Sequence, residues 1–208
     1  MLLFRGRIAM ESIRKILSTA ERMFMRFGIR SVTMDDVARE TSISKKTLYR
    51  CFRDKDELVK KTIEQHLNAI NEKMDELDQR EGDAVSNTLA IANFICSDHR
   101  ELNPSLIFDL KKYHSESYAL FTRQRDQMIS TRVLDNLKKG IVSGLYRNDL
   151  NPELICRFYI NSVGSLFDPE SFPDMEFDFV SRYRELIRYH LHGIVTPEGK
   201  KLLDKIQI

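Results

Sequence analysis

Tryptophan is absent from this sequence of 208 residues, and cysteine, proline and glycine are rare, with three, five and eight copies. The cysteines, Cys51, Cys96 and Cys156, are an odd number at wide spacings. Such a set predicts neither a disulfide framework nor a metal site, and it favours a reducing compartment such as the cytoplasm. Because 31% of the residues are charged and helix breakers are few, amphipathic helices are favoured over a sheet.

Long hydrophobic runs are also missing. The longest stretch without a charged residue is 84–97, and its 14 residues are fewer than the roughly 18–20 that span a bilayer. The start of the chain lacks the apolar core of a signal peptide. We therefore expect a cytoplasmic protein that does not cross a membrane.

Motifs for catalysis and for cofactor binding are absent as well. The sequence has no glycine-rich phosphate loop, no G-x-S-x-G and no C-x-x-C. Its five histidines are scattered, and His190 and His192 point to different sides of a helix, whereas helical metal sites use positions i and i+4. We expect no enzymatic activity, no cofactor and no metal.

Charge is distributed unevenly along the chain. Residues 1–60 carry 14 Lys and Arg against 8 Asp and Glu, a net charge of +6, whereas residues 61–208 carry 19 against 23, a net charge of −4. A basic segment in an otherwise acidic chain is typical of a nucleic-acid-binding domain, although solvated helices also carry such an excess by chance.

The basic segment contains the pattern of a helix-turn-helix. Thr33 and Asp36 have the spacing of a capping box, which predicts a helix from residue 34. Ser44 can cap a second short helix, 45–51, that buries Leu48. This second helix would expose Lys45, Lys46, Thr47, Tyr49 and Arg50, the layout of a helix that enters the major groove of DNA.

The same residues carry a family resemblance. Thr33, Val37 and Ala38 are followed by a tail with a specific spacing: Thr47, Leu48, Tyr49, Phe52, Lys55 and Leu58. This tail resembles the DNA-binding domain of TetR-family transcriptional regulators, and the resemblance covers about residues 10–60. The sequence departs from the family pattern at Ser42, where the turn usually has glycine, and at Cys51, where an aromatic residue or histidine is usual.

The helix-turn-helix and the resemblance together assign DNA contacts. Lys45, Lys46 and Thr47 are expected to reach base edges in double-stranded DNA. The phosphate contacts are expected from hydroxyls and ammonium groups near helix N-termini, namely Thr33, Ser44, Tyr49 and Lys55.

The rest of the chain also reads as helices. Apolar periodicity and capping residues predict seven more, at about 13–27, 54–80, 83–96, 103–112, 116–143, 152–167 and 176–194, and a short one at the end. The fold class is therefore all-α. We place an N-terminal arm and three-helix DNA-binding domain in residues 1–54, and a helical effector-binding and dimerisation domain in residues 55–208.

Two predicted helices, 154–167 and 177–194, are apolar on more than one side. A surface helix needs one apolar stripe, so a second stripe implies a further partner. The resemblance implies a four-helix bundle across a two-fold axis, hence a homodimer with an interface at Val163, Leu166, Val180, Ile187 and Leu191. The alternative is that both stripes lie within the core of one chain.

The resemblance also implies a small apolar effector that releases a repressor from a palindromic operator. Large apolar residues of the middle helices would surround it: Phe94, Phe108, Tyr113, Tyr118, Phe121, Met128 and Phe158. For any one of them taken singly, ordinary core packing is the favoured alternative. A second hypothesis is a helical interaction protein of the same fold, without operator or effector.

Overall fold

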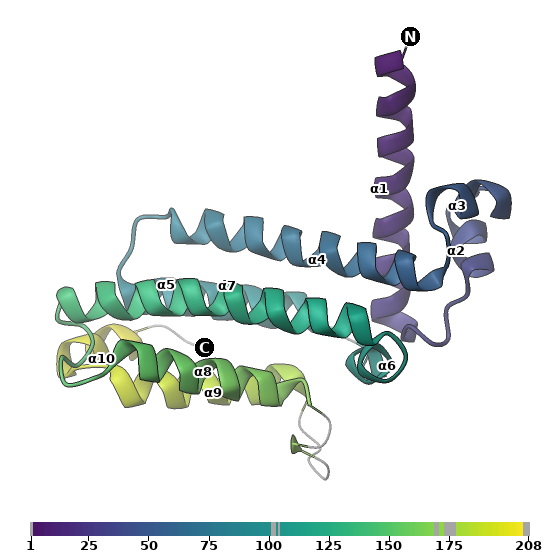
Figure 1. Cartoon of the computed structure of the whole chain (residues 1–208). Helices are drawn as coiled ribbons and strands as arrows, with labels where there is room; N and C mark the ends of the chain where they lie inside the picture. The colour runs from purple at the N-terminus through teal and green to yellow at the C-terminus, as the bar shows by residue number, and fades with distance from the viewer. Residues whose placement is uncertain (1, 101–102, 104, 169–170, 173–177, 206–208) are drawn as a thin grey trace. The chain divides into compact units, whose positions relative to one another are not determined.

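The computed structural model describes residues 2–100, 103, 105–168, 171–172 and 178–205, with side chains from residue 11 onward. These residues form helices, and the one β-type pairing among them is an isolated bridge between Tyr146 and Val195. The helices, labelled in Figure 1, are α1 Leu2–Phe27, α2 Met34–Glu40, α3 Lys45–Cys51, α4 Lys55–Asp78, α5 Ala84–Asp98, α6 Ser105–Tyr113, α7 Ser115–Val142, α8 Pro152–Leu166, α9 Phe179–Ile194 and α10 Pro197–Leu203.

The expected all-α fold is confirmed over the described residues. The expected helix boundaries agree within a few residues, except that α1 begins at Leu2, eleven residues before the expected start at 13. The start expected near residue 176 lies outside the described residues. Within them, no helix is both long enough and apolar enough to cross a membrane.

The chain divides into two compact units. The first contains residues 1–69 and 101–121, and the second contains residues 70–100 and 122–208. The first unit thus combines α1, α2, α3 and the start of α4 with α6. The domain boundary expected between residues 54 and 55 falls at the first residue of α4 and stays a prediction.

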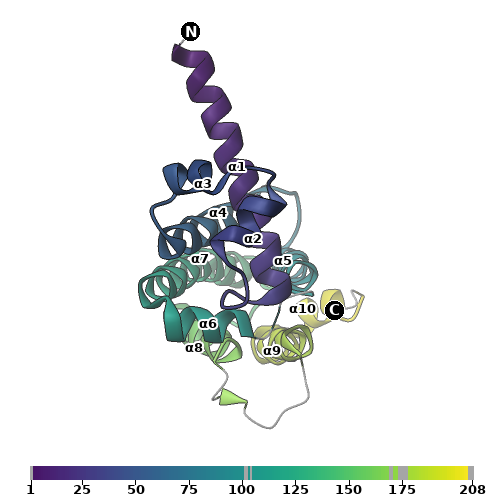
Figure 2. The same ribbon diagram turned by 90° about the vertical axis from the view of Figure 1, so that its right-hand side faces the viewer.

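The core of the first unit forms where α1, α2 and α3 meet. Figure 2 shows α2 beside α1 and α3, and both pairs are in contact. Ile16, Ala20 and Phe24 follow one another at four-residue spacing on α1 and are at most 3% exposed. Ala38 of α2 is also buried, and its small side chain lets a neighbouring helix approach closely. Three helices therefore share one core.

A buried carboxylate ties α6 to this core. Asp109 is 5% exposed, and its Oδ2 accepts a hydrogen bond of 2.8 Å from the backbone N–H of Arg30. The turn after α1 passes so close that a Cβ at Gly28, where φ is +78°, would lie 2.5 Å from the Oγ of Ser105. Glycine is required there both by the left-handed backbone and by the lack of space.

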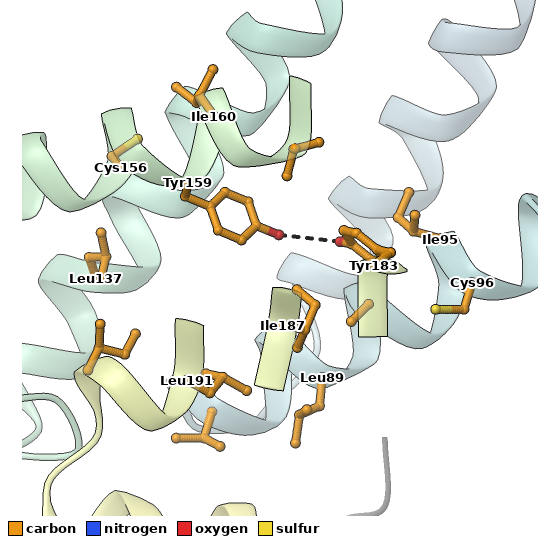
Figure 3. Packing of buried hydrophobic residues seen from close by; sticks show 14 of the residues in the cluster. Leu89, Ile95, Cys96, Leu137, Cys156, Tyr159, Ile160, Tyr183, Ile187 and Leu191 are labelled. Carbon is orange, nitrogen blue, oxygen red and sulfur yellow. Dashed lines mark hydrogen bonds between the residues drawn. The ribbon is translucent and has the colours of Figure 1, made fainter. Parts of the chain in front are cut away.

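The second unit has a separate core, drawn in Figure 3. The hydroxyls of Tyr159 on α8 and Tyr183 on α9 lie 3.3 Å apart among buried aliphatic side chains such as Leu89. Burial raises the pKa of Tyr159 to about 12, so this phenol stays neutral at physiological pH. The pair is therefore a hydrogen bond between uncharged groups inside an apolar core.

This core accounts for most of the residues that we expected at a dimer interface. Val163, Leu166, Ile187 and Leu191 are at most 6% exposed and belong to the core of the second unit, and Val180 packs against it partly buried. The expected assignment is corrected accordingly, because side chains buried within their own chain leave no surface for a partner. Helical periodicity identifies such a stripe but not what covers it.

Gly140 of α7 lies against the buried ring of Tyr146. A Cβ at residue 140 would lie 2.1 Å from the Cδ2 of this ring, whose hydroxyl donates a 2.9 Å hydrogen bond to the Oδ1 of Asn136. The ring is therefore held by the backbone of Gly140 at its carbon atoms and by Asn136 at its hydroxyl.

We expect Gly140→Ala to lower the free energy of unfolding by about 1–3 kcal/mol, because the added methyl group overpacks the contact with Tyr146. Gly193→Ala is the matched control, since Gly193 is also inside a helix and nothing lies within 4 Å of its Cβ position. Urea denaturation followed by circular dichroism measures both. Equal stability of the two variants would contradict the packing argument.

Candidate DNA-binding surface

The first helix of the motif, α2, begins with the expected capping box. The Oγ1 of Thr33 accepts from the backbone N–H of Asp36 at 3.2 Å, and the Oδ2 of Asp36 accepts from the backbone N–H of Thr33 at 3.0 Å. The pKa of the Asp36 carboxyl is lowered by the hydrogen bond that the hydroxyl of Thr33 donates to it and by the one from the backbone N–H of Thr33. Two of the unpaired N–H groups at the start of α2 are thus satisfied.

The turn between α2 and α3 takes the form of a Schellman motif. Ser42 has a positive φ of 58°, Ile43 donates its N–H to the carbonyl of Ala38 at 3.0 Å, and Ser42 donates to that of Arg39 at 3.1 Å. Lys15 of α1 adds a hydrogen bond of 3.3 Å to the carbonyl of Thr41. Ser42 therefore adopts the left-handed conformation that glycine takes more easily.

The second helix, α3, is held by one buried side chain and one cap. Leu48 is fully buried, and the Oγ of Ser44 accepts a hydrogen bond of 3.1 Å from the backbone N–H of Thr47. The side chains turned away from Leu48 are exposed: Lys45, Lys46, Thr47, Tyr49 and Arg50. The exposed set expected from the sequence is confirmed, whereas its contacts with bases stay a prediction.

Within the exposed set the two lysines differ. The Nζ of Lys45 lies 2.5 Å from the Oδ2 of Asp35 on α2, and both side chains remain largely exposed. Lys46 forms no ion pair with any residue that the structure describes. Sequence reasoning missed Asp35, because a pair ten residues apart becomes visible only when the geometry of the turn is known.

Two expected phosphate contacts already have partners within the chain. The Oγ1 of Thr33 also donates to Asp36 at 2.5 Å, and the Nζ of Lys55 donates to the carbonyl of Ile29 at 2.7 Å. Burial lowers the pKa of Lys55, opposed by the nearby negative charge of Asp109. Lys55 thus fastens the start of α4 to the loop before α2, and its role toward phosphate stays a prediction.

The seven residues expected around an effector do not share one environment. Phe108 and Tyr113 are 44% and 43% exposed in the first unit, and Phe158 is 56% exposed in the second. These three differ from the enclosed position that we expected. Phe121 is buried, whereas Phe94, Tyr118 and Met128 are partly buried.

Tyr113 lines a polar cleft of about 450 Å³ in the first unit. Its walls carry charges of both signs, including Lys60 and Glu116, and the imidazole of His114 lies 2.5 Å from the carboxylate of Asp56 there. This cleft therefore lacks the apolar character expected of the effector pocket. Among the described residues, no group of three acidic, histidine or cysteine side chains is placed to hold a metal ion.

Comparison with known proteins identifies relatives. Residues 16–62 match the family model "Bacterial regulatory proteins, tetR family". The uncharacterized HTH-type transcriptional regulator YvaF of Bacillus subtilis strain 168 is 29% identical over 190 residues, which cover 89% of this chain and 96% of YvaF. The HTH-type transcriptional repressor KstR2 of Mycolicibacterium smegmatis is 26% identical over 147 residues, or 69% of this chain and 72% of KstR2.

The fold is shared with solved structures. The crystal structure of a TetR-family transcriptional regulator from Agrobacterium tumefaciens aligns with a TM-score of 0.71 at 17% identity, and the alignment covers 90% of this chain and 100% of that one. At this identity the likeness concerns the fold.

The turn of the motif yields a stability prediction. Ser42→Gly should raise the free energy of unfolding by about 0.5–1 kcal/mol, because glycine adopts the left-handed conformation without steric cost. Ser42→Val should lower it by about 1–3 kcal/mol, since a β-branched side chain is strained there. Chemical denaturation of both variants checks the order Gly, Ser, Val. A valine variant as stable as the wild type would show that the turn is not left-handed.

Proposed function

We propose that this chain, which belongs to the TetR family of bacterial transcriptional regulators, is a repressor that binds a two-fold-symmetric operator as a homodimer and is released by a small molecule. The observation that carries the proposal is the surface of α3. Lys45, Lys46, Thr47 and Tyr49 are exposed together on a helix whose opposite side is anchored by fully buried Leu48. A basic, hydroxyl-bearing face on an anchored short helix suits the major groove.

A symmetric dimer presents its two copies of α3 to successive major grooves, so half-sites about one helical turn apart are expected. Selection of bound sequences from random duplexes, followed by footprinting, tests this part of the proposal. A palindromic consensus with two protected half-sites supports it. Sequence-indifferent or one-sided protection would refute it.

Side-chain changes on α3 separate base reading from phosphate binding. Lys46→Ala should change the selected consensus and cost roughly 1–3 kcal/mol at the affected base pair, because an ammonium group discriminates among base edges. Tyr49→Phe removes an exposed hydroxyl and should weaken binding to all duplexes alike. Selection repeated with each variant is the measurement. An unchanged consensus for Lys46→Ala would remove that residue from the base-reading set.

For the dimer, the exposed sides of α8 and α9 are the relevant surfaces. Leu154 and Phe158 are 50% and 56% exposed and, four residues apart, lie on one side of α8. Tyr189 of α9 is 79% exposed. Large apolar side chains that the chain itself leaves uncovered support a contact with a second copy through α8 and α9. These three residues replace the buried ones in our assignment.

Phe158→Glu should therefore give a folded monomer, because a carboxylate cannot be buried unpaired in an apolar interface. Arg157→Gln is the matched control. It lowers the net charge by one unit, as Phe158→Glu does, at an adjacent exposed residue of α8. Sedimentation equilibrium gives the oligomeric state, and circular dichroism checks folding. Dimers in both variants, or a monomeric wild type, would count against this interface.

The proposed effector would contact apolar side chains of the second unit. Phe94 and Met128, both in the second unit, are partly buried and so retain apolar surface that a ligand can contact. Release requires the ligand to prefer a conformation that binds operator poorly, and operator must then weaken ligand binding by the same factor.

A further inference from the structure

The two acidic residues at the start of α2 have different tasks. The carboxylate of Asp36 completes the capping box with Thr33. The neighbouring carboxylate of Asp35 accepts no hydrogen bond from the described backbone and is instead paired with Lys45 of α3. Capping of α2 therefore does not explain Asp35.

Folding does not favour Lys45 and Lys46, whereas the negative charge of Asp35 suits the first turn of α2. The two lysines are the first two residues of α3, where the partial positive charge of the helix N-terminus disfavours a cation. The pair between Lys45 and Asp35 is exposed, with 67% and 46% of the two side chains accessible, and such pairs contribute little to stability. The pair between Lys45 and Asp35 is therefore expected to affect ligand binding by α3 more than the stability of the fold.

We propose that Asp35 is a specificity-determining residue, which holds the ammonium group of Lys45 and thereby penalises binding to DNA of the wrong sequence. This inference rests on the proposed function, since it requires that α3 read DNA. In this role the carboxylate of Asp35 is a repulsive group within a basic surface, and it acts against binding to the wrong duplex.

The penalty follows from the donors of the ammonium group. Lys45 has three N–H donors, so at the operator it can keep one hydrogen bond to Asp35 and direct another to a base edge. At any other sequence its gain comes from phosphate alone. A phosphate is an anion and competes with the carboxylate of Asp35 for the charge of the ammonium group, whereas a base edge is neutral and does not. Removal of the carboxylate therefore favours non-specific binding over operator binding.

The first unit offers a matched control. Glu40, also on α2, pairs with Arg22 of α1 at 2.8 Å, and 48% of its side chain is exposed, close to the value for Asp35. Glu40→Gln and Asp35→Asn remove the same charge from the same helix. They differ in the cation that is released, which is Arg22 of α1 in Glu40→Gln and Lys45 of α3 in Asp35→Asn.

The test compares the dimeric full-length protein on its selected operator and on a scrambled duplex, by fluorescence anisotropy over a range of salt concentrations. Asp35→Asn should bind the scrambled duplex roughly three- to tenfold more tightly and the operator nearly as the wild type does, so that the specificity ratio falls. Its salt dependence on the scrambled duplex should steepen, because Lys45 then neutralises a phosphate. Glu40→Gln should leave the ratio unchanged.

A double-mutant cycle assigns the effect to the pair. In a Lys45→Met background, Asp35→Asn should leave the ratio as it is in Lys45→Met alone. If Asp35→Asn and Glu40→Gln lower the ratio equally, or if Asp35→Asn still lowers it without Lys45, the inference is overturned and the proposed function stands. If the wild type does not discriminate between the two duplexes, the proposed function fails and the inference fails with it.

Discussion

The burial of Leu48 is the contact on which the DNA-binding surface depends. α2 and α3 have seven residues each, far below the roughly 12–15 that an isolated helix needs to persist in water. Their stability must come from caps and from packing, and Leu48 is the one residue of α3 that is fully buried. The other side chains of that helix, apart from partly buried Cys51, are exposed to solvent or ligand. A single apolar anchor thus separates the folding role of α3 from its role toward DNA.

The features that were predictable from the sequence are those that depend on residues close to one another in the chain. Thr33 and Ser44 start α2 and α3 as their spacing to the next residues indicated, and Ser42, where the family pattern usually has glycine, adopts a left-handed conformation. Caps and turns involve residues within a few positions of one another, so the pattern alone contains the cause. The exposed face of α3 follows in turn from helical periodicity around Leu48.

What could not be predicted depends on partners distant in sequence. An aspartate at position 109 reads as a solvated helix residue, yet it is buried because the N–H of Arg30, 79 residues away, supplies its hydrogen bond. The same limit applies to α8 and α9. Periodicity showed that these helices are apolar on more than one side, but Val163 faces the core of its own chain and Phe158 is exposed. Only the packing distinguishes the two.

Stability and recognition make opposite demands on the first turn of α3. Two adjacent lysines at a helix N-terminus oppose the helix dipole, and a sequence selected for folding alone would place acidic or neutral residues there. The helix tolerates them because Ser44 caps it, Leu48 anchors it, and Asp35 offsets one of the two charges from the neighbouring helix. The unfavourable interaction of the lysines with the helix dipole destabilises a helix that is too short to fold by itself. Contacts with the surrounding domain therefore have to stabilise it. Sites of recognition are where such local conflicts are expected.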